Sequence, residues 1–253
     1  MRFFLFRRLA GGVALKTIAV IPASLASTRL PRKMLHLIAG EPLLAHVVRA
    51  VRSSPLLAEV IVATDSEEIL AFCQKNSWPA RMTSAAHRSG TERVHEISKA
   101  LEADVYLNIQ GDEPLTRPEH IAALLQVMRN PAVEVGTLKT PCPEHDVENP
   151  NAVKVDCETG GRALYFSRST IPHDRDATSP RYYKHLGFYA YRKAALDRFV
   201  SLPESFLERS ERLEQLRFME NGTSIHVGET LYDTVGVDTI EDAQRVEDVL
   251  RRR

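Results

Sequence analysis

The feature that most constrains this chain is the alternation, through its first half, of short apolar segments with longer amphipathic ones. Apolar residues predict buried strands at 17–21, 60–63 and 105–109. Between and after these segments the apolar residues recur with the helical period. Parallel strands need a crossover connection, which is usually a helix, so this order predicts an α/β fold with a mostly parallel sheet.

Helix signals agree with that interpretation. The first predicted helix spans 43–51, and its buried face consists of Leu43, Leu44, Val47, Val48 and Val51. A second helix is expected to begin at Asp65 or Ser66, followed by two glutamates near the positive end of its dipole. The capping-box spacing of Thr116 and Glu119 predicts a third helix start. The buried face of that helix is expected to contain Ile121, Leu124, Leu125 and Met128.

The second half of the chain changes character near Asn149. Residues 153–156 and 162–166 predict a hairpin with a glycine-containing turn at 158–161. Residues 184–191 then alternate as a strand does. One face of this strand would carry His185, Gly187, Tyr189 and Tyr191, and the other Leu186, Phe188 and Ala190. The polar and aromatic face is what a ligand-facing sheet surface needs.

Two helices are expected after this strand. Ser210 is expected to begin the first, which carries Leu213, Leu216 and Met219 and ends at Asn221-Gly222. The second runs over about 240–250, where three following arginines suit the negative end of its dipole. The whole pattern predicts one α/β domain, a mostly parallel twisted sheet flanked by helices, with a smaller lobe that contains the hairpin.

The composition excludes several classes of protein. Lysine plus arginine equals aspartate plus glutamate at 33 each, so the formal net charge is zero. No overall field therefore draws the chain to nucleic acid or to an anionic membrane, and an anionic ligand must be bound locally. Hydrophobic residues at 43% favour a substantial core over disorder. Three cysteines without a Cys-x-x-Cys pair are expected to be reduced thiols, which indicates a cytoplasmic protein.

Residues 1–16 differ from the rest of the chain. Arg7 and Arg8 interrupt their apolar runs, which never approach the roughly 20 residues of a membrane-spanning helix, so no stable membrane insertion is expected. The segment also lacks the continuous apolar stretch and cleavage site of a secretory signal. An arginine-rich start without acids would suit organelle targeting. We expect a disordered extension or a start codon set too early, with the single domain over 17–253.

A cationic loop, 21–35, follows the first predicted strand directly. Loops at the carboxyl ends of strands form the binding crevice of open α/β sheets. Arg29, Arg32 and Lys33 bring three cations to this loop with no acid before Glu41, which suits a ligand with several phosphate charges. Ser27 and Thr28 add hydroxyl donors. The alternative is a solvated basic turn. The chain contains neither the P-loop spacing nor G-x-G-x-x-G, which argues against those two nucleotide-binding classes.

Two aspartates are candidate metal ligands. Asp112 follows the predicted strand 105–109, and a carboxylate there, close to a phosphate-binding loop, can hold Mg²⁺. Asp238 lies between a short apolar segment and the start of the last helix. The alternatives are that Asp112 only caps its own turn and that Asp238 only caps the helix. Convergence of both carboxylates on one ion would favour the metal site.

Eight sequence blocks, taken together and in order, closely resemble the 3-deoxy-manno-octulosonate cytidylyltransferase family, over about residues 17–250. The blocks are STRLP with Lys33, HRSGTERV at 87–94, LNIQGDEP at 107–114, NPNAVKV at 149–155, ALYFSRSTIPHDRD at 163–176, KHLGFYAYR at 184–192, RLEQLR at 212–217 and VGVDTIEDA at 235–243. STRLP-type loops occur in several nucleotidyltransferases, so the specificity of the match comes from the set.

The resemblance implies a reaction and its partners. CTP and the sugar acid Kdo would give CMP-Kdo and pyrophosphate with Mg²⁺ as cofactor, on a fold of the nucleotide-diphospho-sugar transferase type and usually in a homodimer. The hydroxyl on the anomeric carbon of Kdo would attack the α-phosphorus in line. Residues 17–148 would form the nucleotide-binding part, 149–234 the sugar-acid and dimer part, and 235–253 a returning strand and helix. The product would feed lipopolysaccharide synthesis.

The resemblance also assigns residues to roles. Asp112 and Asp238 match the magnesium-binding aspartates, and with Arg29 and Lys33, which match residues at the CTP phosphates, they form the catalytic set. The nucleotide-binding set consists of Ser27, Thr28, Arg29, Lys33, Ser89, Gly90, Arg93, Gln110 and Asp112. The sugar-acid set consists of Gln110, Arg168, His185, Tyr189, Glu214 and Gln215. Arg168 suits a bidentate contact to the carboxylate of Kdo. His185 could equally make a structural hydrogen bond, and Glu214 could lie on a solvated helix face.

Two positions depart from the family pattern. The first loop usually begins I-P-A-R and contains L-P-G-K, and here those positions are Ser24 and Arg32. Loss of an arginine beside the nucleotide would remove a contact of about 1.5–3 kcal/mol, and the hypothesis is that Arg32 partly compensates. Two alternatives stay open. One is a cytidylyltransferase for a related sugar acid, such as 8-amino-Kdo or a sialic acid, and the other is a weakly active CTP-binding paralogue.

Overall fold

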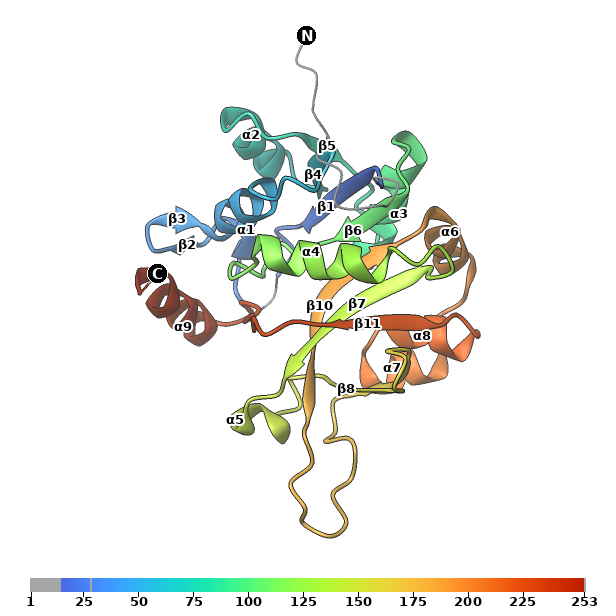
Figure 1. Ribbon diagram of the computed structural model, residues 1–253. Helices are drawn as coiled ribbons and strands as arrows, with labels where there is room; N and C mark the ends of the chain where they lie inside the picture. The colour runs from blue at the N-terminus through green and yellow to red at the C-terminus, as the bar shows by residue number, and fades with distance from the viewer. Residues whose placement is uncertain (1–14, 28, 253) are drawn as a thin grey trace.

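The computed structural model describes residues 15–27 and 29–252, and one nine-stranded sheet runs through this part of the chain. Seven strands form the order β11-β7-β10-β6-β1-β4-β5, while β8 pairs with β10 and β9 with β8 (Figure 1). The strands of this sheet are β1 (Thr17–Ala23), β4 (Glu59–Thr64), β5 (Ala80–Met82), β6 (Val105–Asn108), β7 (Val135–Pro141), β8 (Lys154–Cys157), β9 (Ala163–Ser167), β10 (Tyr183–Tyr191) and β11 (Ile225–Glu229). A separate two-stranded ribbon consists of β2 (Leu37–Ile38) and β3 (Glu41–Pro42).

Helices connect these strands, and three of them, at 90–100, 144–147 and 193–201, were not predicted from the sequence. They are α1 (Leu43–Arg52), α2 (Glu67–Lys75), α3 (Gly90–Ala100), α4 (Pro118–Val127), α5 (Glu144–Val147), α6 (Lys193–Ser201), α7 (Phe206–Glu211), α8 (Gln215–Glu220) and α9 (Ile240–Arg251), with a 3₁₀ turn, η1, at Lys33–Leu35. Strand β1 pairs in parallel with β4 and β6, and β4 with β5, whereas β10 runs antiparallel to β6 and β7. The expected α/β fold with a mostly parallel, helix-flanked sheet is confirmed, and the hairpin β8–β9 is present beside it.

Two apolar layers cover the two faces of the sheet. On one face, α1, α2 and α4 pack with Leu186, Phe188 and Ala190 of β10. On the other face, α3, α6 and α8 pack with Tyr189 and Tyr191 of the same strand. The alternation predicted for this strand is therefore confirmed. Each large apolar side chain buried in these layers stabilises the fold by about 1.5–3 kcal/mol.

Two helix starts differ from those expected. The sequence predicted Thr116 as the cap of the helix that follows it. In the structure Arg117 is the cap and Pro118 the first helical residue, so α4 begins one residue later than predicted. Thr116 Oγ1 donates to the carbonyl of Glu113, while His120 Nδ1 accepts from the Arg117 N–H at 3.1 Å. A proline at the first helical position lacks only an N–H that would have no partner there, so it fixes the boundary.

The helix expected to begin at Ser210 is two short helices. Ser205 caps α7, with its hydroxyl accepting from the Glu208 N–H, and Ser210 lies inside this helix. Arg212 then adopts a left-handed conformation with φ of 55°, which ends α7, and α8 begins at Gln215. The end at Asn221 is as expected. The break matters because it turns the chain at 212–214 toward the site described below.

The two ends of the described chain are packed. Leu15 contacts the first apolar layer, and the Lys16 N–H donates to Asp104 at 2.7 Å, so order begins within the predicted extension. The rest of that prediction, for residues 1–14, lies outside the described residues. At the other end α9 packs through Ala243 and Val246 on Leu30 and Ile38. No helix of the described residues has the length and apolar character needed to cross a membrane.

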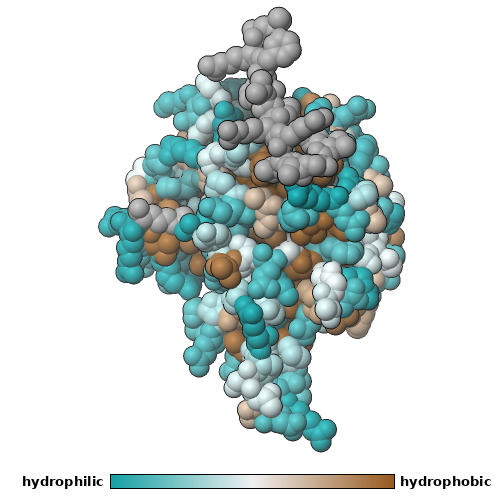
Figure 2. Space-filling model, in the orientation of Figure 1, coloured by the Kyte–Doolittle hydropathy of each residue, from teal (hydrophilic) through white to brown (hydrophobic). Residues whose placement is uncertain are grey.

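A long connection between β9 and β10 projects from the body of the protein at the bottom of the view (Figure 1). Figure 2 shows that this projection is coloured mostly teal and white, so its visible surface is polar. Figure 2 also shows larger brown areas on the body, where apolar side chains reach the surface among polar ones.

Candidate functional site

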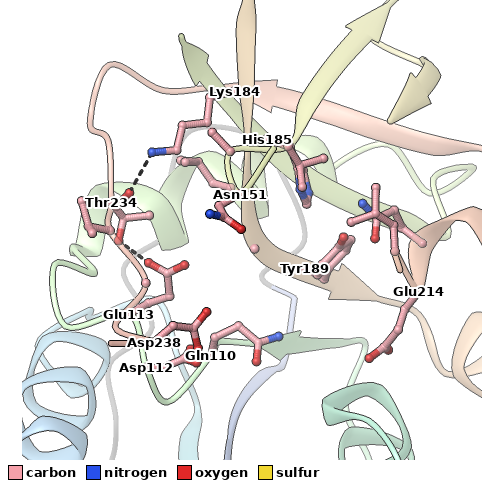
Figure 3. A pocket seen from close by; sticks show the side chains of 18 of the residues that line it. Gln110, Asp112, Glu113, Asn151, Lys184, His185, Tyr189, Glu214, Thr234 and Asp238 are labelled. Carbon is pink, nitrogen blue, oxygen red and sulfur yellow. Dashed lines mark hydrogen bonds between the residues drawn. The ribbon is translucent and has the colours of Figure 1, made fainter. Parts of the chain in front are cut away.

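A cavity of about 620 Å³ lies where the end of β6 and the loop after β1 meet β10 and the segment that leads to α9. Its lining is strongly polar. Figure 3 shows Asp112, Asp238 and Glu113 at one end of the cavity, Tyr189 and Glu214 at the other, and Gln110 between them. Because ligands of open α/β sheets bind beyond the carboxyl ends of parallel strands, the cavity lies where a substrate site is expected.

Asp112 and Asp238, which are far apart in the sequence, meet at the ammonium of Lys33. Lys33 Nζ lies 2.5 Å from Asp112 Oδ2 and 2.9 Å from Asp238 Oδ1. Arg29 Nη2 lies 2.9 Å from Asp238 Oδ2, and its side chain is more than half exposed. The loop 21–35 thus brings two cations to two carboxylates, and the four side chains of the expected catalytic set lie together.

Local structure explains why the two aspartates meet. A Cβ added at Gly111 would lie only 2.7 Å from the Pro22 carbonyl oxygen, so the glycine lets the loop after β6 pack directly on the end of β1. The Val237 N–H donates to the Asp112 carbonyl at 2.9 Å, which joins the two aspartate segments. Thr239, rather than Asp238, caps α9. Asp238 is therefore free of the capping role that sequence alone allowed it.

The charges at this end of the cavity are coupled. Burial lowers the pKa of Lys33, but the carboxylates of Asp112 and Asp238 outweigh that effect and hold the pKa above its ordinary value. The lysine is therefore charged at neutral pH and neutralises part of the acidic pair. Two carboxylate oxygens that already share one cation have the donor chemistry that Mg²⁺ uses together with phosphates. Among the residues described here, no cluster of three or more His, Cys, Asp and Glu side chains offers a protein-only metal site.

Glu113, beside Asp112, has an unusual environment that the sequence did not reveal. Burial and the neighbouring Asp112 charge raise the pKa of Glu113 to about 7, although the Thr234 hydroxyl that donates to it opposes the shift. Near neutral pH the two neighbouring carboxyls thus carry less than two negative charges. That limits their mutual repulsion before a cationic partner arrives.

Lys184 forms a second ionic group on the cavity wall. Its ammonium lies 3.1 Å from Asp146 Oδ2 and 3.1 Å from Asp233 Oδ1. It also donates to the Thr234 carbonyl, the residue whose hydroxyl contacts Glu113. Burial lowers the pKa of Lys184, but the charges of Asp146 and Asp233 outweigh that effect, so the pKa lies above its ordinary value. These contacts hold Asp233 and Thr234 against β10.

The polar face of β10 supplies the middle of the cavity. His185, Gly187, Tyr189 and Tyr191 all line it, together with Gln110 from the loop after β6. His185 Nε2 lies 2.9 Å from the Thr137 hydroxyl, and burial lowers the pKa of this imidazole to about 3. The ring is therefore neutral at pH 7. It has a structural hydrogen bond and also reaches the cavity, so both functions that the sequence left open are available to it.

The far end of the cavity is formed by α8 and its approach. Glu214 and Gln215 line it, so Glu214 is not on a solvated helix face. Burial raises the pKa of Glu214, although the hydroxyls of Thr91 and Ser89 oppose the shift. Four buried side-chain polar atoms have no hydrogen-bond partner within the described chain, and two of them, Gln215 Nε2 and Asn108 Oδ1, belong to residues that line the cavity. Such atoms are costly unless a ligand or water satisfies them.

The expected residues of the block 87–94 take mostly structural positions. Ser89 caps α3 by accepting from the Glu92 N–H at 3.3 Å, and Gly90 is the first residue of that helix. Arg93 is buried, and its guanidinium donates to Asp65 and Thr83, both at 2.7 Å. None of these three is among the described residues that line the cavity. Ser27 accepts from the Leu30 N–H. Thr28 lies outside the described residues.

Arg168, which the resemblance assigns to the sugar acid, makes backbone contacts that the sequence did not reveal. Its guanidinium donates to the carbonyl oxygens of Pro150 at 3.0 Å, Glu211 at 2.7 Å and Arg212 at 3.3 Å. Arg168 is not among the described residues that line the cavity. The cation that the sequence assigned to a substrate therefore stabilises the backbone turn at 211–212.

Of the two departures in the first loop, neither side chain replaces the missing cation. Arg32 adopts a left-handed conformation with φ of 57°, and its guanidinium pairs with Glu68 on α2. Glycine adopts this conformation without strain, which accounts for the glycine usual here. Ser24 donates weakly, at 3.4 Å, to Asp65, the carboxylate that Arg93 also contacts. Compensation by Arg32, as hypothesised from the sequence, does not agree with this arrangement.

Many residues that line the cavity were not predicted from the sequence, and for three of them a signal was present. Asn108 and Glu113 lie in the block LNIQGDEP, on either side of the residues selected there, and Lys184 opens the block KHLGFYAYR. A charged or amide side chain at the end of a buried strand is the signal that would have identified them.

A cytidylyltransferase family model matches residues 18–225. A curated 3-deoxy-manno-octulosonate cytidylyltransferase of Koribacter versatilis (strain Ellin345) is 62% identical over 239 residues, 94% of this chain and 91% of that protein. Another from Acidobacterium capsulatum is 54% identical over 241 residues, 95% of this chain and 98% of that protein. A solved CMP:2-keto-3-deoxy-manno-octonic acid synthetase complexed with CTP has a TM-score of 0.90 at 43% identity, covering 94% of this chain and 99% of that one.

Proposed function

The chain belongs to the cytidylyltransferase family, and on that basis we propose that it transfers CMP from CTP to 3-deoxy-D-manno-octulosonate (Kdo) with release of pyrophosphate. The relatives at 62% and 54% identity both carry the name of this activity. The single structural observation that supports the proposal most is that Asp112 and Asp238, which line one end of the cavity, meet at the buried ammonium of Lys33. A triphosphate needs this combination of cations and metal-binding carboxylates.

The proposed transfer is one displacement at phosphorus. The anomeric hydroxyl oxygen of Kdo forms a bond to the α-phosphorus of CTP, and the bond from that phosphorus to the bridging oxygen of the β-phosphate breaks. Pyrophosphate leaves with the electron pair of the broken bond, and the attacking hydroxyl loses its proton to solvent. The protein forms no covalent bond to the substrates in such a reaction, so catalysis consists of positioning them and neutralising their charge.

In this proposal the triphosphate binds at the end of the cavity where Arg29 and Lys33 lie. The loop 21–35 contributes these cations and Ser27, and Thr28 is assigned to the nucleotide by the resemblance alone. The segment 110–112 closes the other side with Gln110 and Asp112. Arg29 is suited to move from Asp238 to a phosphate because its side chain is 62% exposed. Ser89, Gly90 and Arg93 are proposed to act on the nucleotide indirectly. Ser89 caps α3, which begins at Gly90, and Arg93 donates to Asp65.

Magnesium is the cofactor that we propose for this site. Asp112 and Asp238 would hold the ion, which supplies positive charge to the triphosphate when bound. Their oxygens fit the ion because they already converge on one cation, the ammonium of Lys33. The two side chains retain 27% and 43% exposure, which leaves room for the waters that Mg²⁺ usually keeps.

The sugar acid is proposed to bind in the middle and at the far end of the cavity. Gln110, His185, Tyr189, Glu214 and Gln215 line this part and offer donors and acceptors to sugar hydroxyls. The unpartnered Nε2 of Gln215 supports the assignment, because a hydroxyl acceptor there would satisfy a buried donor. Arg168 would act on this region indirectly, through the turn at 211–212.

We further propose that the protein is a homodimer that works in the cytoplasm. The homodimer is what the family resemblance implies. Light scattering after size exclusion would give twice the chain mass. Cys73, Cys142 and Cys157 are free thiols, which agrees with a reducing compartment. Fractionation of cells that produce the tagged chain would test the location.

The function is tested by pyrophosphate release with each pairing of CTP or UTP with Kdo, 8-amino-Kdo or a sialic acid at millimolar Mg²⁺. Release with CTP and Kdo at the highest kcat/KM supports the proposal. A higher value for 8-amino-Kdo or a sialic acid would reassign the substrate. No release with any pair would make the chain a CTP-binding paralogue and refute the proposal.

A further inference from the structure

The segment 230–239 carries Asp238 to the cavity, and all of its residues lie outside helices and strands. It follows β11 and leads to α9. A ligand of a metal ion must be held within about 0.5 Å of its productive place by the groups around it. Because the segment has no regular structure of its own, contacts from neighbouring elements must hold Asp238 in position.

Backbone hydrogen bonds hold the segment near its two ends. The Thr230 N–H donates to the Lys139 carbonyl of β7 at 2.9 Å, and the Val237 N–H donates to the Asp112 carbonyl, also at 2.9 Å. Side chains contact the residues between these two points. Among them, Lys184 on β10 contacts the middle of the segment and also reaches α5.

The ammonium of Lys184 has a full set of partners. It lies 3.1 Å from Asp233 Oδ1, 3.3 Å from the Thr234 carbonyl oxygen and 3.1 Å from Asp146 Oδ2, and Figure 3 shows the contact with Thr234. A lysine ammonium has three N–H donors, and these three groups accept all of them. The side chain lines the cavity but is only 13% exposed. Its donors are therefore used within the protein rather than left for a ligand.

The side to which Lys184 ties the segment is itself well held. Asp146 also accepts from Asn149 Nδ2 at 2.9 Å. The buried ammonium of Lys154 donates to the carbonyls of Asn149 at 2.8 Å and Ala152 at 2.6 Å. Asp146, Asn149 and Ala152 all line the cavity. Lys184 thus joins a firmly held wall of the cavity to a segment that has little structure of its own.

On the basis of the proposed function, we propose that Lys184 is a positioning residue for the metal-binding aspartates. It holds the segment 230–239 against α5 and so places Asp238 beside Asp112. Thr234, whose carbonyl accepts from Lys184, donates through its hydroxyl to Glu113, so the same ammonium also steadies the residue next to Asp112. Outer partners of metal ligands change metal affinity or activity about 10–100-fold when they are lost. Lys184 acts through the backbone of the segment, so we expect the lower end of that range.

The first test follows amide hydrogen exchange in the protein without ligands. Lys184→Met should make the peptide that spans 230–238 exchange about tenfold faster, because its middle loses the contact with β10. Lys139→Met is the matched control. That lysine lies on the neighbouring strand, its ammonium lies 3.7 Å from the centre of the Tyr183 ring, and it is not among the described residues that line the cavity. The control should leave exchange in 230–238 unchanged.

The second test measures pyrophosphate release against Mg²⁺ concentration in Lys184→Met and Asp233→Asn. The asparagine keeps the oxygen that accepts the Thr234 N–H and leaves the ammonium in place, so it weakens only the tie to the segment. Both variants should need about tenfold more Mg²⁺ for half the maximal rate and should have a lower kcat. KM for Kdo is expected to stay within about threefold. Lys184→Arg, which keeps a cation for both aspartates, should recover most of the loss.

Asp233→Asn separates positioning from direct binding of a substrate. If Lys184 bound a substrate, Lys184→Met would raise KM, while Asp233→Asn would keep the natural Mg²⁺ dependence, and that pair of results would overturn the proposal. Natural exchange of 230–238 in both variants would overturn it too. Should Lys184→Met fail to fold, Asp233→Asn decides both measurements alone. Failure of the proposed function would differ from these outcomes, since the natural protein would then release no pyrophosphate at any Mg²⁺ concentration.

Discussion

Replacement of Lys33 by methionine tests the ionic cluster at the center of the site. The change keeps the length of the side chain and removes the ammonium that Asp112 and Asp238 share. Loss of one partner of a buried ion pair costs about 3–5 kcal/mol. The Lys33 side chain is 10% exposed, but that of Asp238 is 43% exposed, so water compensates part of the loss. We therefore expect a decrease of about 2–3 kcal/mol in the free energy of unfolding.

Urea and thermal unfolding measure this decrease without reference to activity. For a domain of this size a loss of that order lowers Tm by about 4–12 °C. Combining Lys33→Met with Asp112→Asn should cost about 1–3 kcal/mol less than the sum of the two single changes, since the double variant leaves fewer unpaired charges. Lys193→Met is the matched control, because that lysine pairs with Asp197 at the surface, where both side chains are about half exposed. The control should lose less than about 0.5 kcal/mol.

Two results would refute this reasoning. A loss from Lys33→Met no larger than that of the Lys193 control would show that the ammonium does not hold the carboxylates together. Strict additivity of the Lys33 and Asp112 changes would show that the two groups do not interact in the folded protein. Either result would also remove the physical basis for a shared cation at the site.

Three further changes give distinct outcomes. Arg32→Gly should leave KM for CTP within about twofold, because the guanidinium pairs with Glu68 rather than lining the cavity; a fivefold rise would place Arg32 at the nucleotide. The pKa of His185 is about 3 in the folded protein, against 6.5 ordinarily, so only the unfolded chain gains this proton as the pH falls from 6.5 toward 3. The folded state therefore has its full stability above pH 6.5 and loses part of it below. Urea unfolding at pH 7.5 and 4.5 should show a smaller loss of unfolding free energy in His185→Gln than in the natural protein. An equal loss in both proteins would contradict this prediction. Glu208→Ala removes the carboxylate that contacts Arg217 at 2.6 and 2.7 Å, and should cost about 3–5 kcal/mol in urea unfolding; a cost below about 1 kcal/mol would contradict a buried pair.

The parts of the fold that local patterns control were predictable from the sequence. The alternation in 184–191 gave the two faces of β10 correctly, because a strand between two layers must bury alternate side chains in each. The buried face of α1 followed from its apolar spacing in the same way. The approach of Asp112 to Asp238 was predictable only through the resemblance, since nothing local connects residues so far apart in the chain.

Local patterns do not show which partner a side chain takes when several are available. Arg168 is expected at the sugar acid by resemblance, and the contacts of its guanidinium with three carbonyl oxygens could not be predicted from the sequence. The break at Arg212 could not be predicted because the apolar spacing continues across it, and the left-handed conformation depends on tertiary contacts. The sequence grouped Arg32 with the other cations of the loop 21–35, whereas in the structure Arg32 pairs with Glu68 of α2.

The most direct test of the central claim is kcat for pyrophosphate release in Asp112→Asn, Asp238→Asn and the double variant, all at saturating CTP and Kdo. If the two carboxylates act as a unit on the triphosphate, each single change should lower kcat by about 10²–10³-fold, and the double change should add little. Asp248→Asn, on the exposed side of α9, is the control and should keep the natural value. Retention of the natural kcat by either single variant would contradict the account.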